Sequence, residues 1–141
     1  MLCIEFSDII QSNKHQVDVL TEVARKHPDP QVPAACQAFS RQVRLVESVV
    51  EGTYVIAVEA TRKSESLQEI AQVWQATGSL CDKALGVVSG LKDRYRYCGT
   101  PELHDRLLDY KLACTRRYEQ VQEEILCQTM PTPEGLFPSL T

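Results

Sequence analysis

The chain has 141 residues, of which 43% are hydrophobic and 24% are charged, and its formal net charge is −4. This length suits one domain with a continuous core, and the composition is that of a folded rather than a disordered chain. The negative charge argues against a broad surface for nucleic acid or anionic lipid. The sequence shows neither a run of about 20 apolar residues nor a signal-peptide pattern, so we expect no transmembrane segment and a cytoplasmic location.

Six cysteines are spread along the chain, and none belongs to a Cys-x-x-Cys pair. Isolated cysteines at apolar positions behave as small hydrophobic residues. Because no export pattern is seen, we expect free thiols in a reducing compartment, with no metal ion and no cofactor. The cysteines are Cys3, Cys36, Cys81, Cys98, Cys114 and Cys127.

The first predicted helix covers residues 4–26. Its apolar residues recur at steps of three and four, which is the spacing of a helix packed against neighbours on one side. The last turn holds Arg25 and Lys26, which suit the negative end of a helix dipole. Prolines at positions 28, 30 and 33 then prevent the helix from continuing, so this boundary is the clearest in the chain.

The second predicted helix covers residues 34–63, and its middle, 49–58, is apolar on nearly all sides. A strand over 53–58 is an alternative because β-branched residues are frequent there, but the helical period runs through it. A bundle helix normally keeps one face in solvent. The outer apolar residues therefore either lie under a wide core stripe or form an exposed patch for a partner or a second copy. These residues are Tyr54, Val55 and Val58.

The third predicted helix covers residues 66–98 and carries the most regular stripe. Ser66 and Glu69 form a capping-box pattern at its start, and Gly99 suits the position just past its end. Glycines at positions 78, 86 and 90 weaken the isolated helix, so we expect a neighbouring helix to approach closely there. The stripe consists of Leu67, Ile70, Trp74, Thr77, Cys81, Ala84, Val88, Leu91, Tyr95 and Cys98.

The fourth predicted helix covers residues 101–129. Thr100 is expected to cap it through its hydroxyl group, with Pro101 at the first position. Pro131 and Pro133 begin an irregular tail, 131–141, in which Leu136 and Phe137 either fold back on the bundle or are offered to another protein's groove.

Short connections between long helices make successive helices antiparallel. The predicted fold class is therefore all-α, an elongated up-down-up-down four-helix bundle over residues 1–130 followed by the tail.

A basic and aromatic cluster follows the third stripe, in the run from Lys92 to Tyr97. Arginine and tyrosine are enriched at the centres of protein interfaces. The cluster is either an ordinary solvated helix face or the binding site for an acidic or phosphorylated partner. RNA is disfavoured because no long basic groove accompanies it. The candidate residues are Arg94, Tyr95, Arg96 and Tyr97.

Catalytic motifs are weak. No Glu-x-x-His pair and no glycine-rich phosphate loop occurs. Cys98 and His104 would have to meet across a turn to form a nucleophile and base, and no third group orients them. We therefore expect no enzyme activity.

Polar residues interrupt the apolar stripes at Asn13, Thr53 and Thr77. Such residues fix helix register or bond to the backbone, or else they line a cavity. Two functions follow. The first is a non-catalytic adaptor or scaffold module that binds proteins through its helical faces, with a homodimer through residues 34–63. The alternative is a bundle that binds a small hydrophobic ligand or lipid near Trp74.

Overall fold

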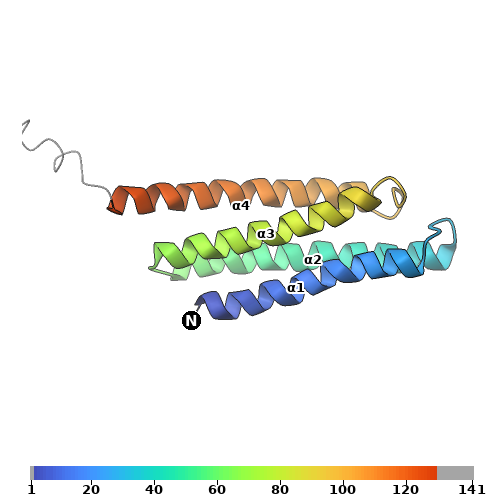
Figure 1. Cartoon of the computed structure of the whole chain (residues 1–141), viewed down its shortest axis with the longest axis horizontal. Helices are drawn as coiled ribbons and strands as arrows, with labels where there is room; N and C mark the ends of the chain where they lie inside the picture. The colour runs from blue at the N-terminus through green and yellow to red at the C-terminus, as the bar shows by residue number, and fades with distance from the viewer. Residues whose placement is uncertain (1, 130–141) are drawn as a thin grey trace, which may run out of the picture.

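The computed structural model describes residues 2–129 of the chain, and within this range the fold is a bundle of four long helices (Figure 1). The all-α, up-down-up-down prediction is confirmed. Residues 53–58 lie inside the second helix, so the strand alternative is wrong. The helices are α1 (Leu2–Lys26), α2 (Pro33–Lys63), α3 (Leu67–Leu91) and α4 (Thr100–Thr129). The predicted tail, with Leu136 and Phe137, lies outside the described residues.

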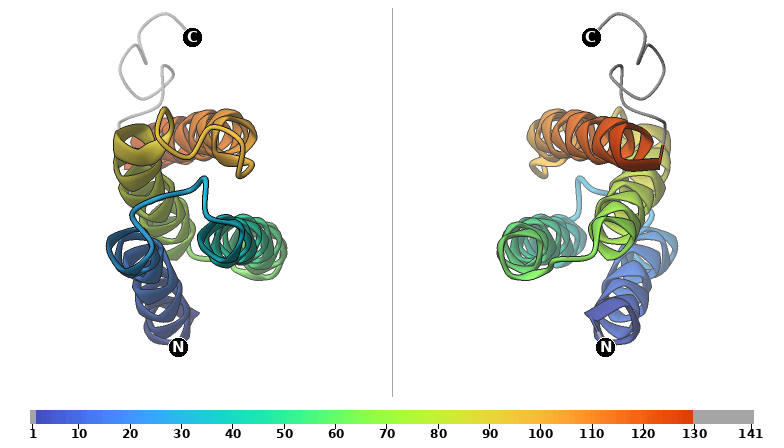
Figure 2. Two further views of the ribbon diagram at one scale, coloured as in Figure 1. Left: turned by 90° about the vertical axis from the view of Figure 1, so that its right-hand side faces the viewer. Right: turned by 90° about the vertical axis from the view of Figure 1, so that its left-hand side faces the viewer.

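Helices α2 and α3 form the middle of the bundle. Each packs against all three other helices, whereas α1 and α4 do not touch within the described residues (Figure 2). The bundle is thus a rhombus in cross-section, with α1 and α4 at its far corners, rather than a square. This arrangement explains why the stripe of the third predicted helix is buried throughout, except for the half-buried Leu67 and Leu91.

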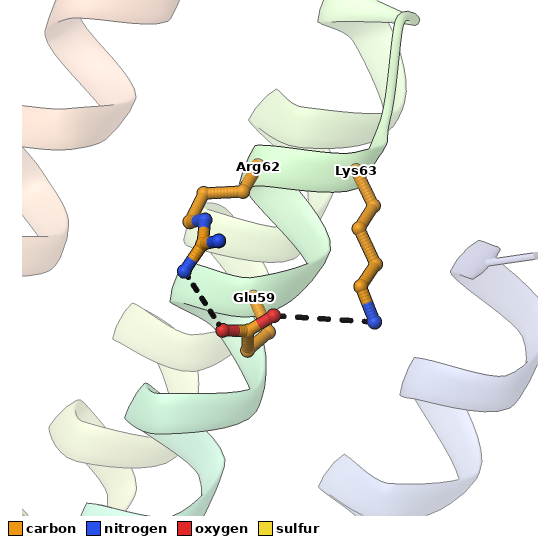
Figure 3. A network of polar contacts seen from close by, with 3 residues as sticks. All are labelled: Glu59, Arg62 and Lys63. Atoms are coloured by element: carbon orange, nitrogen blue, oxygen red, sulfur yellow. Dashed lines mark hydrogen bonds and ion pairs between the residues drawn. The ribbon is translucent and has the colours of Figure 1, made fainter.

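The helix ends follow local sequence rules. Pro33 takes the first turn of α2, where its missing N–H is not needed. At α3, the Ser66 hydroxyl accepts the backbone N–H of Glu69 at 3.3 Å, as the capping pattern predicted. The last turn of α2 holds Arg62 and Lys63, which lie 3.0 and 3.9 Å from the two carboxylate oxygens of Glu59 (Figure 3). These charges are exposed, so each pair adds less than about 1 kcal/mol.

Helix α3 ends at Leu91, seven residues earlier than predicted, and residues 92–99 form a series of turns. The prediction was wrong because Tyr95 and Cys98 keep the helical spacing and are buried, although the backbone leaves the helix. The Thr100 hydroxyl donates to the Tyr95 carbonyl at 2.8 Å and so does not cap α4. Gly99, with φ of +83°, supplies the reversal at the start of α4.

The glycines of α3 differ from one another. A Cβ atom at Gly78 would lie 3.7 Å from the Cβ atom of Cys114, so α4 does approach closely there. A Cβ atom at Gly86 or Gly90 would meet nothing within 4 Å. The predicted close approach is therefore confirmed at Gly78 and wrong at the other two positions.

The C-terminal end of α4 extends beyond the turn between α2 and α3 (Figure 1). Val121 is the last buried residue described on α4.

Among the described helices, none combines the length and apolar character that a bilayer crossing requires.

Candidate functional site

The basic and aromatic cluster lies at one end of the bundle, on the turn 92–99 that joins α3 to α4 (Figure 1). Tyr95 points inward and is fully buried. Its ring stacks on the ring of Phe39 from α2, with centroids 3.9 Å apart and planes 12° from parallel. Tyr95 therefore anchors the turn to the core and is not available to a partner.

The same turn is tied to the loop between α1 and α2. The Tyr95 hydroxyl lies 2.8 Å from the His27 carbonyl oxygen and 3.1 Å from that of Ala24, so it donates to the end of α1. The Arg94 guanidinium donates to the carbonyl of Pro28. These bonds satisfy carbonyls at a helix end and hold two loops, far apart in sequence, in one fixed arrangement.

Tyr97 points the opposite way, and 88% of it is exposed. The Arg96 guanidinium carbon lies 5.7 Å from the centre of its ring, which is cation–π distance. A pocket of about 280 Å³ lies beside these two residues. Its lining residues are Pro30, Gln31, Asp93, Arg94, Arg96, Tyr97 and Cys98. We call this set the corner pocket. Its charged groups are two guanidiniums and one carboxylate.

The candidate residues on α2 do not form one patch. Tyr54 is half-buried among other rings, 5.4 Å from Trp74 and 5.2 Å from Tyr110 between centroids. Val58 is also half-buried and packs against the core. Of the three, only Val55 is exposed, with 56% of it in solvent. Tyr54 and Val58 therefore lie under a wide core stripe, whereas Val55 belongs to an exposed face of α2.

Arg117 has a structural role that was not predicted from the sequence. Its guanidinium carbon lies 4.9 Å from the Trp74 ring centre and 6.0 Å from that of Tyr54. The residue is half-buried, so this cation–π contact is shielded from water and stabilises the junction of α2, α3 and α4. Helical spacing indicates that Arg117 lies near an apolar stripe, but it does not show which aromatic ring its guanidinium contacts.

The polar residues in the stripes bond within the bundle. The Thr53 hydroxyl donates to the Val49 carbonyl at 2.6 Å and also accepts the side-chain amide of Asn13 from α1. The Thr77 hydroxyl donates to the Val73 carbonyl at 2.8 Å. These contacts support the register and backbone-bonding interpretation.

Two grooves bear on the ligand-binding alternative. One, of about 480 Å³, lies between α1 and α3 beside Phe6, Ile10 and Val73, and its rim is polar. The other, of about 280 Å³, runs past Trp74 and Gly78. Small-molecule sites typically have volumes of about 300–1,000 Å³. The first groove lies within this range, and the second, like the corner pocket, lies just below it.

The proposed thiol–base pair is not assembled. The Cys98 sulfur lies 3.4 Å from the sulfur of Cys36, and His104 Nδ1 lies 3.5 Å from a carboxylate oxygen of its neighbour Asp105. Burial, followed by the hydrogen bond with Cys36, raises the pKa of the Cys98 thiol. Among the side chains that the structure describes, those of residues 5–128, no three from His, Cys, Asp or Glu gather as metal ligands would.

Comparisons with known proteins assign no role to these residues. No protein-family model matches the chain, and neither a curated protein nor a solved structure matches it.

Proposed function

We propose that the protein is a non-catalytic interaction module that binds an acidic or phosphorylated segment of another protein at the corner pocket. The observation that carries this proposal is the exposed Tyr97 beside Arg96, on a turn whose other tyrosine is locked into the core. Covering a large aromatic side chain with a partner removes apolar surface from water, which favours binding.

The rigidity of the corner supports the proposal. Tyr95 fixes the turn, and the Arg94 bond to Pro28 fixes the opposite wall of the pocket. A site that is already ordered loses little conformational entropy on binding, so more of the contact energy appears as affinity. Tyrosine and arginine are also the residues that most often dominate interface energetics.

The charges of the corner indicate the partner. Arg94 and Arg96 outnumber Asp93, and the corner belongs to a chain of net charge −4. Guanidinium groups match carboxylate and phosphate oxygens in pairs. The excess of positive charge at the corner pocket would attract an acidic or phosphorylated peptide to it, although the chain as a whole is negative.

The test is an array of peptides that are neutral, acidic or phosphorylated, probed with the intact chain. The double variant Arg96→Glu, Tyr97→Ala should weaken binding of acidic or phosphorylated peptides by at least about tenfold, because a hot spot contributes about 1.4 kcal/mol or more. Arg116→Glu is the matched control, since it makes the same charge change at an exposed site on α4. Equal binding by both variants, or no preference for acidic peptides, would contradict the proposal.

A second candidate surface for protein binding lies on α2. The outer face of α2 exposes Leu45, Val55 and Ile56, with Gly52 between them. Because nothing lies within 4 Å of a Cβ atom built at Gly52, another helix has room to approach this face closely. We propose that this face, rather than Tyr54 or Val58, mediates any association with a second copy of the chain.

A further inference from the structure

We propose that Cys36 and Cys98 form an oxidation site, a dithiol that a peroxide converts to a disulfide. The proposal goes beyond partner binding and does not depend on it. The two residues are 62 positions apart in the sequence, and they come from different elements, the first turns of α2 and the turn 92–99. Their sulfurs nevertheless lie 3.4 Å apart, at van der Waals contact.

The geometry suits bond formation. A disulfide needs a sulfur–sulfur distance of about 2.05 Å, so the two atoms must approach by a little over an ångström. Side-chain rotation and small backbone shifts supply such a movement, because Cys98 lies in a turn rather than in a helix. Neither residue bonds to a third cysteine, and both are free thiols.

The two thiols differ in access. Cys36 is half-buried and its sulfur lies 4.0 Å from the Ser40 hydroxyl, so a small oxidant can reach it. Cys98 is only 4% exposed and lines the floor of the corner pocket. Cys36 is therefore suited to react first, and Cys98 is placed to react with its product.

The reaction balances with hydrogen peroxide as oxidant. The Cys36 thiolate attacks one peroxide oxygen, the O–O bond breaks, and the released hydroxide takes the proton that Cys36 lost and becomes water. The Cys98 sulfur then attacks the Cys36 sulfenic acid, the S–O bond breaks, and the hydroxyl leaves as water with the Cys98 proton. Two electrons pass from the two sulfurs to the peroxide, and one peroxide gives two waters.

The chain contains an internal control. Cys81 on α3 and Cys114 on α4 are also neighbours, but both are buried. The hydrogen bond with Cys114, together with burial, raises the pKa of Cys81. The same hydrogen bond lowers the pKa of Cys114, so the resistance expected of this pair rests on access. Because both of its sulfurs are buried, the second pair should resist peroxide under conditions that oxidise the first.

The test maps disulfides in the full-length protein. The reduced chain is treated with a small excess of hydrogen peroxide, free thiols are alkylated, and tryptic fragments are weighed. Cleavage after Lys and Arg puts Cys36 in fragment 27–41 and Cys98 in fragment 97–106, with no other cysteine in either. We expect the two fragments to be joined, two hydrogen atoms lighter than their sum, at least about tenfold more often than the fragments of the buried pair.

Variants sharpen the test. Cys98→Ser should leave a sulfenic acid at Cys36 that a dione reagent traps, whereas Cys127→Ser, a matched change at an exposed thiol, should leave the cross-link intact. If a variant fails to fold, the fragment map of the wild-type protein still tests the proposal. Free Cys36 and Cys98 after peroxide treatment, or cross-links scattered equally among the cysteines, would overturn the proposal.

Discussion

Tyr95 and Tyr97 lie two residues apart on one turn and have opposite environments. Tyr95 is fully buried and stacked on Phe39, whereas 88% of Tyr97 is exposed. Residues two apart lie about 200° apart around a helix, so a helical backbone would also direct these two side chains to opposite sides. Both tyrosines were expected in one binding cluster, although Tyr95 also continues the core stripe of the third predicted helix. Its burial separates the two roles: Tyr95 belongs to the core and Tyr97 to the surface.

Removing one hydroxyl group tests the anchoring role of Tyr95. Tyr95→Phe leaves the Ala24 and His27 carbonyls without this donor and should lower the free energy of unfolding by about 1–3 kcal/mol. Urea denaturation followed by circular dichroism measures the change. Tyr97→Phe is the matched control and should have almost no effect. A Tyr95→Phe variant as stable as this control would show that the hydroxyl does not hold the corner together.

Tyr110 gives a prediction for alkaline pH. Burial, followed by the charge of Glu51, raises the pKa of its phenol above the usual 10.0. Above that pH the unfolded chain loses the phenol proton while the folded chain keeps it, so the unfolded state binds fewer protons and stability falls as pH rises. Below about pH 9, both states keep the proton, so the phenol does not affect how the free energy of unfolding changes with pH.

Comparison with Tyr110→Phe isolates this contribution. Between about pH 9 and 11, the wild-type protein should lose more stability than the variant, because only the wild type carries the perturbed phenol. Chemical denaturation at several pH values provides the two curves. Parallel curves would mean that the environment of Tyr110 does not disfavour its charge.

At the scale of helices and turns, the spacing of apolar residues was sufficient to predict the four helices. The stripes of three- and four-residue steps placed α1, α2 and the start of α3 within two residues of their observed bounds. The same signal failed at the end of α3, because Tyr95 and Cys98 remain in phase with the stripe after the helix stops. A periodic pattern reports which side chains are buried, and a turn can bury side chains at helical spacing as well.

Two glycines provide a matched test of the observed turn. Gly99 has φ of +83°, which strains any residue with a Cβ atom, so Gly99→Ala should cost about 1 kcal/mol. Gly86 lies inside α3 with open space around it, so Gly86→Ala should add about 0.5–1 kcal/mol. Thermal unfolding measures both. If Gly99→Ala were neutral or stabilising, α4 would not begin with a left-handed residue.

At the scale of the whole molecule, the rhombic packing could not be predicted. Short loops require antiparallel neighbours, but they do not decide whether α1 packs beside α3 or beside α4. In the structure, α3 packs beside both α1 and α4. Two ion pairs accompany these contacts: Lys83 on α3 pairs with Asp18 on α1 at 2.9 Å, and Lys111 on α4 pairs with Asp82 on α3 at 2.5 Å. Both pairs are partly exposed, so they add little stability to the packing.

The exposed face of α2 gives a prediction about assembly. If copies of the chain associate through this face, Val55→Glu should shift sedimentation toward the monomer while helicity stays unchanged, because 56% of Val55 is already in solvent. Val58→Glu is unsuitable, since Val58 packs on the core and the charge would be buried. A monomer before the change, or an oligomer unaffected by it, would exclude this face as the contact.

The central claim is that partners bind at the corner pocket, and an NMR titration tests it most directly. The isotope-labelled protein is titrated with the tightest acidic or phosphorylated peptide from the array, and shifted backbone signals are mapped on the bundle. We predict shifts concentrated at the pocket residues that carry a backbone N–H, namely Gln31, Asp93, Arg94, Arg96, Tyr97 and Cys98. Shifts concentrated instead around Val55 on α2, or along the groove beside Phe6 and Val73, would contradict the claim.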